Sequence, residues 1–451
     1  MISFGFISVM NCISIHKDFK IEESLQGNQI VKIEPVYNLS KTEQNVVVIM
    51  LDRAMTGFLP YLFEEKPELK EQYDGFVYYP NTVSFARFTV TASSALWGGY
   101  EYQPFEINKR DVPLVDEHNQ ALKVLPKLFT DNGYYVSFSD APLANHLSVS
   151  DMSIMKDIDN LSAFNTIGKY SQIWMKEKGI KELDYTAEKI LRNTIWFSIV
   201  KMAPNFTRKY IYKNGEYWSA NISTFEVGPF IDSYSVLDYL PELTSFDSSS
   251  KSCMFLDNET PHTEVYLSLP DYEIEIGEIK EFADHEVAKD RLYHTTSAAI
   301  IRLVDWINYL KENDVYDNTR IIIASDHGNI PEVKYDKNPL ELHKELKYMT
   351  NALLLVKDFD SRGTIETDNS FMCNADVPYL ATKDLIDNPC NPYTGTPLLS
   401  EENKKDGLIV TSNRKHRVRE HKKNKFNIND DEWFVVKDNI FDNKNWSKLY
   451  E

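Results

Sequence analysis

The sequence is short of cysteine and of positive charge. Its 451 residues include four cysteines, Cys12, Cys253, Cys373 and Cys390, and no Cys-x-x-Cys pair, which argues against a structural zinc knuckle. Cys373 and Cys390 could form a disulfide outside the cytoplasm, and free buried thiols are the alternative. The formal net charge of −19 argues against nonspecific binding to nucleic acid, because phosphate contacts need Lys and Arg. It also argues against broad docking on an anionic bilayer.

The apolar stretches that could enter a membrane are short or interrupted. Residues 1–15 carry no charge, but a spanning helix needs about 20 apolar residues, and no basic segment precedes them as in a signal peptide. They are either the remnant of a membrane helix or a buried N-terminal element. A second stretch, 190–202, is interrupted by Arg192, Asn193 and Lys201. It is either part of a lid over a functional site or a core helix.

Apolar strands alternate with amphipathic helices along most of the chain, and 42% of the residues are hydrophobic, as in globular proteins. Helices are expected at Gln120–Thr130 and Thr295–Lys311, where apolar residues recur on one face. Strands are expected at Asn45–Leu51, Phe76–Tyr79, Tyr134–Phe138, Cys253–Leu256, Thr319–Ser325 and Asn351–Val356. This order predicts an α/β fold, a three-layer α/β/α sandwich with a mostly parallel sheet.

Departures from this alternation indicate the domain boundaries. We expect an N-terminal segment at 1–40, a main domain at 41–385 and a C-terminal extension at 386–451, where Asn, Pro, Gly and Thr become frequent and favour loops. Residues from about 150 to 250 break the order of strands and helices, which indicates an inserted cap.

One run of positive charge stands out in this acidic chain. Seven of the residues in 414–425 are Lys or Arg. The run is either a docking patch for phosphate or lipid headgroups, or a solvated loop that pairs with acidic surface.

The most informative motif is Asp326-His327-Gly328, directly after the apolar run Thr319–Ser325. In open α/β sheets, ligands bind at the carboxyl ends of the strands. Asp and neutral His are good ligands for Zn²⁺ or Mn²⁺, and Gly would let the backbone turn sharply beneath an ion. Many such triplets are plain turns between a strand and a loop, so the motif needs a second observation.

Asp52 supplies that observation, because it follows the apolar run Asn45–Leu51 in the same way. An Asp there is more often a turn or helix cap, but two strands that each end in a potential ligand suggest one shared site. Between them lies Phe88–Glu101, a segment rich in hydroxyl groups. A hydroxyl bound to a metal ion loses its proton more easily and becomes a nucleophile.

Asp52, the Thr-rich segment, His262 and the Asp-His-Gly motif follow one another in an order that resembles the alkaline phosphatase superfamily. The most similar branch is that of the sulfatase-like membrane transferases, which are lipoteichoic acid synthases, phosphoglycerol transferases and phosphoethanolamine transferases. The segments Asn81–Phe85 and Val315–Gly328 carry the likeness, which covers about residues 44–380.

This resemblance implies a mechanism and a set of site residues. One Zn²⁺ or Mn²⁺ would be held by Asp52, Thr89, Asp326 and His327. Thr89 would attack phosphorus and form a phospho-Thr intermediate. His262 would bind the substrate phosphate, for which a surface loop histidine is the alternative, and His343 could be a second phosphate contact.

Thr89 and Thr91 compete as the nucleophile. Sulfatases of the superfamily use a Cys or Ser in a Cys/Ser-x-Pro-x-Arg pattern, which this sequence lacks. In related proteins a Gly follows about ten residues after the nucleophile, and Gly99 then favours Thr89, whereas Thr91-Ala92 with Ser94 resembles the phosphoethanolamine branch. One departure weakens assignment to a branch, since the transferases commonly have Glu where this chain has Asp52.

The resemblance implies a metal-dependent transferase that moves a phospho-headgroup onto a cell-envelope acceptor, at the cell membrane and outside the cytoplasm. The donor would be a phospholipid or a glycan-linked phosphodiester, and membrane association would come through a missing or shortened N-terminal part. The alternatives are a hydrolase of phosphate or sulfate esters with the same site, and a non-catalytic binding module on the same fold. A binding module would have no need of the four ligands.

Overall fold

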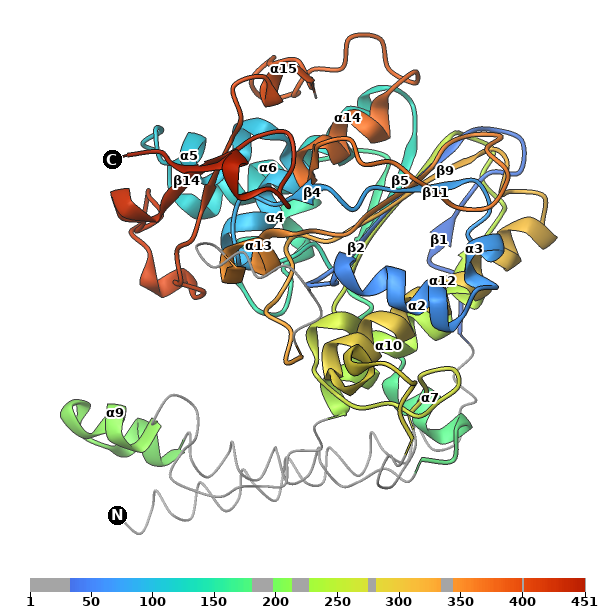
Figure 1. The fold of residues 1–451 in the computed structure, drawn as a ribbon, viewed down its shortest axis with the longest axis horizontal. Coiled ribbons are helices and arrows are strands. Elements are labelled where there is room, and N and C mark those ends of the chain that lie inside the picture. The colour runs from blue at the N-terminus through green and yellow to red at the C-terminus, as the bar shows by residue number, and fades with distance from the viewer. Residues whose placement is uncertain are drawn as a thin grey trace. The chain divides into compact units, whose positions relative to one another are not determined.

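An eight-stranded sheet forms the centre of the protein in the computed structural model, which describes residues 33–180, 198–212, 227–274, 281–333, 344–399 and 401–450 (Figure 1). The strand order is β11-β3-β10-β9-β2-β8-β5-β6. The strands are β2 (Asn45–Leu51), β3 (Phe76–Tyr78), β5 (Tyr135–Ser139), β6 (Leu161–Phe164), β8 (Ser252–Asn258), β9 (Thr319–Ala324), β10 (Leu354–Lys357) and β11 (Glu366–Thr367).

The sheet is mostly parallel, as the sequence predicts. The strands from β9 to β6 in this order run parallel, whereas β10 runs antiparallel to both of its neighbours, β9 and β3. All seven residues of β2 are buried, because this strand lies between β8 and β9 and is covered on both faces. That environment explains its unbroken run of apolar side chains.

Helices cover both faces of the sheet, so the predicted three-layer sandwich is confirmed (Figure 1). One layer contains α4 (Thr89–Gly98), α6 (Leu114–Asp131) and α14 (Val377–Thr382), and the other contains α2 (Leu59–Glu65), α3 (Leu69–Gln72), α10 (Gly228–Asp238) and α12 (Arg291–Glu312). On the α4 face, Trp97 packs 4.7 Å from Phe138 and 5.8 Å from Phe255 between ring centroids. These rings join α4 to the sheet.

Short elements connect this framework. The remaining helices are α5 (Pro104–Ile107), α7 (Ser171–Glu177), α9 (Asn205–Tyr212), α11 (Leu240–Leu243), α13 (Lys344–Thr350) and α15 (Glu401–Lys404). Two small parallel pairs are formed by β1 (Tyr37–Asn38) with β7 (Thr244–Ser245) and by β4 (Thr82–Val83) with β12 (Met372–Cys373).

The range expected for an inserted cap, 150–250, contributes directly to the sandwich. Strand β6 extends the central sheet beside β5, and α10 packs on α12. Of the apolar stretch 190–202, residues 190–197 lie outside the described residues, as do 1–32 of the expected N-terminal segment. No helix among the described residues is long and apolar enough to cross a membrane.

The C-terminal extension packs onto the main domain. It forms the antiparallel sheet β13 (Leu408–Thr411), β14 (Trp433–Val436) and β15 (Trp446–Lys448). Apolar side chains of this sheet share one hydrophobic cluster with Val83, Phe85 and Ala95 of the main domain. Of the two cysteines that could have paired, Cys373 and Cys390, both are free thiols, as is Cys253.

We expect Trp97→Ala to lower the free energy of unfolding by about 3–5 kcal/mol, because it leaves a cavity between α4 and the sheet. Trp97 is fully buried. Urea denaturation followed by circular dichroism measures the change. Tyr450→Ala is the control, since Tyr450 is exposed and its loss should have little effect. Equal effects of the two substitutions would contradict the packing described above.

Candidate active site

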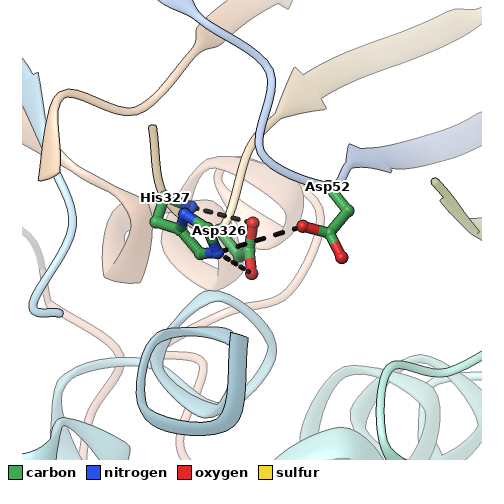
Figure 2. A group of neighbouring side chains, drawn as sticks. All are labelled: Asp52, Asp326 and His327. Atoms are coloured by element: carbon green, nitrogen blue, oxygen red, sulfur yellow. Dashed lines mark hydrogen bonds and ion pairs between the residues drawn. The ribbon is translucent and has the colours of Figure 1, made fainter. Parts of the chain in front are cut away.

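Three buried side chains meet at the carboxyl edge of the central sheet (Figure 2). Asp52 follows β2, and Asp326 and His327 follow β9. These strands are parallel neighbours with Met50 opposite Ala324, so their ends reach the same place. Nε2 of His327 lies 4.0 Å from Oδ1 of Asp52 and 3.6 Å from Oδ2 of Asp326. The structure therefore brings together three of the four ligands that the resemblance implies.

His327 is oriented by its own loop. Its Nδ1 lies 2.5 Å from the carbonyl oxygen of Gly328, so Nδ1–H donates there and the lone pair of Nε2 faces the two carboxylates. Gly328 is needed for a reason that differs from the sharp turn expected from the sequence. A Cβ at this position would lie 2.2 Å from the carbonyl oxygen of Tyr348 and 2.8 Å from that of Asn351.

Thr89 is the first residue of α4 and points toward these ligands. Its Oγ1 lies 3.5 Å from both carboxylate oxygens of Asp52 and 3.4 Å from Nε2 of His327. Thr91 is buried, and its hydroxyl donates to the carbonyl oxygen of Phe88 at 3.0 Å. Of the two candidate nucleophiles, the structure brings Thr89 to the ligands and turns Thr91 back into its own helix.

A cavity of about 550 Å³ opens beside these residues. Asp52, Thr89 and His327 line it, and three further acidic residues that the sequence had not marked as site residues, Asp140, Asp257 and Glu259, line it too. The one feature of the sequence that could have indicated these three residues is that each lies at or just after the end of a strand. Burial raises the pKa of all three, and the nearby carboxylates raise those of Asp257 and Glu259 further.

The acidic residues of the site fit a divalent cation. Burial raises the pKa of Asp52 well above its usual value, and the negative charges of Asp326 and Glu259 raise it further. Oδ2 of Asp326 and Oδ1 of Asp257 are buried and accept no hydrogen bond from the part of the chain that the structure describes. A cation among these oxygens would offset both the crowding of negative charge and the loss of hydration.

Arg53 brings a positive charge to the cavity. Its φ of 66° is in the left-handed region, which non-glycine residues rarely adopt, and it lets the backbone N–H donate to Oδ1 of Asp326 at 3.2 Å. The guanidinium is held by Glu264 at 2.8 Å and by the carbonyl oxygen of His262 at 3.2 Å. Sequence analysis missed Arg53 because its role depends on this unusual backbone conformation.

His262 also lines the cavity, in a short 3₁₀ helix after β8. Its side chain is exposed to the cavity. Partial desolvation and the positive charge of Arg53 lower its pKa, which keeps the imidazole neutral at pH 7 and able to donate a hydrogen bond. His343, the other expected phosphate contact, lies outside the described residues.

His416, from the C-terminal extension, completes the wall of the cavity. Its ring lies 5.7 Å from that of Phe88, and the ring of Phe88 lies 6.3 Å from that of His327. The sequence marked the basic run 414–425 as a possible docking patch for phosphate, but it could not place His416 at the cavity, because this residue is far along the chain from the other site residues.

Comparison with known proteins finds matches in structure alone. No family model and no curated protein matches the sequence. Among solved structures, the chain is similar to a protein in the alkaline phosphatase superfamily from Vibrio parahaemolyticus (12% identity, 93% of this chain and 84% of that chain, TM-score 0.43). It is also similar to the lipoteichoic acid synthase LtaP from Listeria monocytogenes (14% identity, 87% of this chain and 85% of that chain, TM-score 0.40). A third similar structure is the phosphonate monoester hydrolase SpPMH from Silicibacter pomeroyi (13% identity, 84% of this chain and 82% of that chain, TM-score 0.45).

These structures are of the kind that the sequence resemblance names.

We expect Zn²⁺ or Mn²⁺ to raise the Tm of EDTA-treated protein, because an ion that binds only the folded state stabilises it, by about 2.7 kcal/mol at a hundredfold excess over Kd. Asp326→Asn should remove most of this shift in a thermal-denaturation assay. Asp159→Asn, at an exposed position, is the control and should keep the shift. An equal shift in both variants would exclude a metal at Asp326.

Asp257→Asn should stabilise the metal-free protein above about pH 5. The raised pKa of Asp257 means that folded protein binds a proton that the unfolded chain has already lost, so stability falls as the pH rises above the unfolded value of about 4. Removing this charge should add on the order of 1 kcal/mol near pH 7.5. Urea denaturation in EDTA measures the gain, which should shrink near pH 4.5, and a gain independent of pH would contradict the assigned charge.

Proposed function

We propose that the protein is a metal-dependent phosphotransferase in which Thr89 is the nucleophile. The observation that carries this proposal is the position of the Thr89 hydroxyl, within 3.5 Å of Asp52 and His327 at the floor of a cavity. By contrast, the hydroxyls of Thr91 and Ser93 donate to backbone carbonyl oxygens, as is usual for Ser and Thr in a helix.

The cation site explains how a weak nucleophile could react. Zn²⁺ or Mn²⁺ held by Asp52, Asp326 and His327 beside Thr89 would supply the positive charge that lowers the pKa of the hydroxyl and offsets charge on the phosphoryl oxygens. The Nδ1–H of His327 is fixed by Gly328, which keeps Nε2 free for this role. The backbone N–H of Arg53 holds Asp326 in place.

Thr89 Oγ1 would form a bond to phosphorus as the bond to the leaving alcohol breaks, and the product would be a phospho-Thr. Neutral His262 would donate a hydrogen bond to a phosphoryl oxygen, and the proton that the Thr89 hydroxyl loses would pass through solvent to the leaving alkoxide. The guanidinium of Arg53 and the N-terminal N–H groups of α4 would hold the anionic phosphoryl oxygens, because both present positive charge there. An acceptor hydroxyl would then attack phosphorus and release Thr89.

The two serines after Thr89 disfavour sulfatase chemistry. Ser93 donates to the carbonyl oxygen of Thr89 at 2.7 Å, and Ser94 bonds to Nδ1 of buried His118 at 2.8 Å. Both hydroxyls are therefore directed away from the cation site. Hydrolysis of a phosphate ester by the same residues, with water as the acceptor, is the alternative to transfer.

The substrates follow from the sequence resemblance. The donor would be a phospholipid or glycan-linked phosphodiester, the acceptor a hydroxyl of the cell envelope, and the site would lie outside the cytoplasmic membrane. The cavity of about 550 Å³ is within the usual range for small-molecule sites and so would admit a headgroup.

Thr89→Ala should abolish turnover of bis(4-nitrophenyl) phosphate in the presence of Mn²⁺ or Zn²⁺, because it removes the hydroxyl that lies within 3.5 Å of Asp52 and His327. The cost should be at least a thousandfold, roughly the loss seen when a covalent nucleophile is removed. Release of 4-nitrophenol measures turnover. Circular dichroism should show an intact fold.

Thr91→Ala is the matched control and should keep most of the activity, because its hydroxyl bonds within α4. Mass spectrometry of the peptide that contains residues 88–100 should find the phosphoryl adduct on Thr89 in wild-type protein. An adduct on Thr91, or full activity of Thr89→Ala, would overturn the assignment.

A further inference from the structure

The segment 416–421 of the C-terminal extension lies along the rim of the active-site cavity. At one end, His416 lines the cavity and packs against Phe88. At the other end, His421 lies near enough to His146 for the two imidazoles to interact electrostatically. His146 belongs to the loop 140–150, of which residues 140–143 and 148–150 line the cavity. The segment therefore lies between His416 in the cavity wall and this loop.

Bonds at both ends fix the segment to the main domain. Before it, Arg414 pairs with Glu345 at 2.6 Å, and Arg87 donates to the carbonyl oxygen of Ser412 at 3.4 Å. After it, the carbonyl oxygen of Lys423 accepts a hydrogen bond of 2.8 Å from Leu114 at the start of α6. The segment is therefore held in place beside the cavity at both ends.

Glu420 gives the segment its conformation. Its carboxylate accepts hydrogen bonds from the backbone N–H groups of His416 at 3.1 Å and Arg417 at 2.9 Å. Arg417 in turn donates from Nε to Nε2 of His416 at 3.0 Å. These contacts orient the backbone and the imidazole of His416. The Glu420 carboxylate, the acidic group of the segment, is occupied by these backbone hydrogen bonds.

The guanidinium groups of Arg417 and Arg419 have no acidic partner within 4.0 Å in the described ranges of the chain, and both side chains are exposed. The alternative expectation is that the basic run 414–425 pairs with acidic surface. Among the Lys and Arg residues of this run, Arg414 alone forms an ion pair within the described ranges. In a chain with a net charge of −19, such a pair of free cations at a cavity rim is a local positive field.

The interior of the cavity has the opposite charge. Asp52, Asp140, Asp257 and Glu259 line it with Arg53 as the one permanently cationic side chain among the lining residues. An anionic ester must pass or rest beside the rim to reach Thr89. Because Arg417 and Arg419 lie outside the acidic cavity, they would interact with a part of the substrate that stays outside when the ester group is at Thr89.

We propose that Arg417 and Arg419 form a second anion-binding subsite, and that the substrate carries a further phosphate- or sulfate-type group beyond the reacting ester. This inference rests on the proposed function of the cavity, whose reacting centre is at Thr89. The subsite selects substrates by charge and takes no part in bond breaking. His416 separates the two positions and orients Arg417.

Two phosphodiesters with the same 4-nitrophenol leaving group test the subsite. One carries a propyl arm and the other a 3-propanesulfonate arm, so they differ in one remote negative charge. We expect wild-type protein to favour the sulfonate in kcat/KM by about fivefold, which is what two exposed charge pairs of ordinary strength supply. In the double variant Arg417→Gln/Arg419→Gln this ratio should fall to about one, through KM and not kcat.

The control is Lys405→Gln/Lys448→Gln, which removes the same charge from exposed positions elsewhere in the extension. It should keep the wild-type ratio. A wild-type ratio near one, or an equal fall in the control variant, overturns the subsite while leaving the proposed function intact.

Binding of the fluorescent trisulfonate pyranine, measured by anisotropy on the full chain, makes the test independent of turnover. The Kd should weaken about fivefold in Arg417→Gln/Arg419→Gln and stay unchanged in the control. If wild-type protein cleaves neither ester, the proposed function is wrong, and the pyranine result alone decides the subsite. Equal pyranine affinity in all three proteins rejects it.

Discussion

The confinement of like charges at the end of three parallel strands is the constraint on which this site depends. Strands β9, β2 and β8 are neighbours in register, so Asp326 and Asp52, which follow β9 and β2, and Asp257, near the end of β8, meet at one edge of the sheet. Each carboxylate loses hydration there and repels the others. The fold can keep them together only because the sandwich around the sheet is stable enough to carry this cost, or because a cation is bound.

The other features of the site follow from that constraint. The strained backbone of Arg53 gives one of these carboxylates an N–H donor and adds a cation within the cavity. Thr89 reaches the acidic cluster because α4 begins at that point and is fixed to the sheet by Trp97. Further positive charge, that of Arg417 and Arg419, lies at the rim of the cavity on the C-terminal extension. The cavity is therefore mainly acidic inside and basic at its rim.

The sequence predicted the centre of the site because each ligand is adjacent to an apolar strand, and a buried strand is the clearest local pattern in a chain. Asp52, Asp326 and His327 needed only the rule that parallel strands end together. The sequence favoured Thr89 over Thr91 only through the position of Gly99, and the structure distinguishes them because the two side chains point to different sides of one helical turn. Arg53 and His416 were not predicted, because a backbone angle in one case and a long-range return of the chain in the other place them at the cavity. The antiparallel direction of β10 likewise depends on its connection to β9, which has no distinct pattern of side chains.

The shared hydrophobic cluster between the C-terminal sheet and residues Val83, Phe85 and Ala95 has a consequence for the order of events in biosynthesis. A ribosome makes Asp52, Thr89, Asp326, His327 and the whole central sheet before it makes β13, β14 and β15. Until those strands emerge, the flank of α4 beneath Thr89 lacks its apolar cover, and the rim segment 416–421 is missing. The nascent chain therefore cannot complete the cavity until these strands have been made.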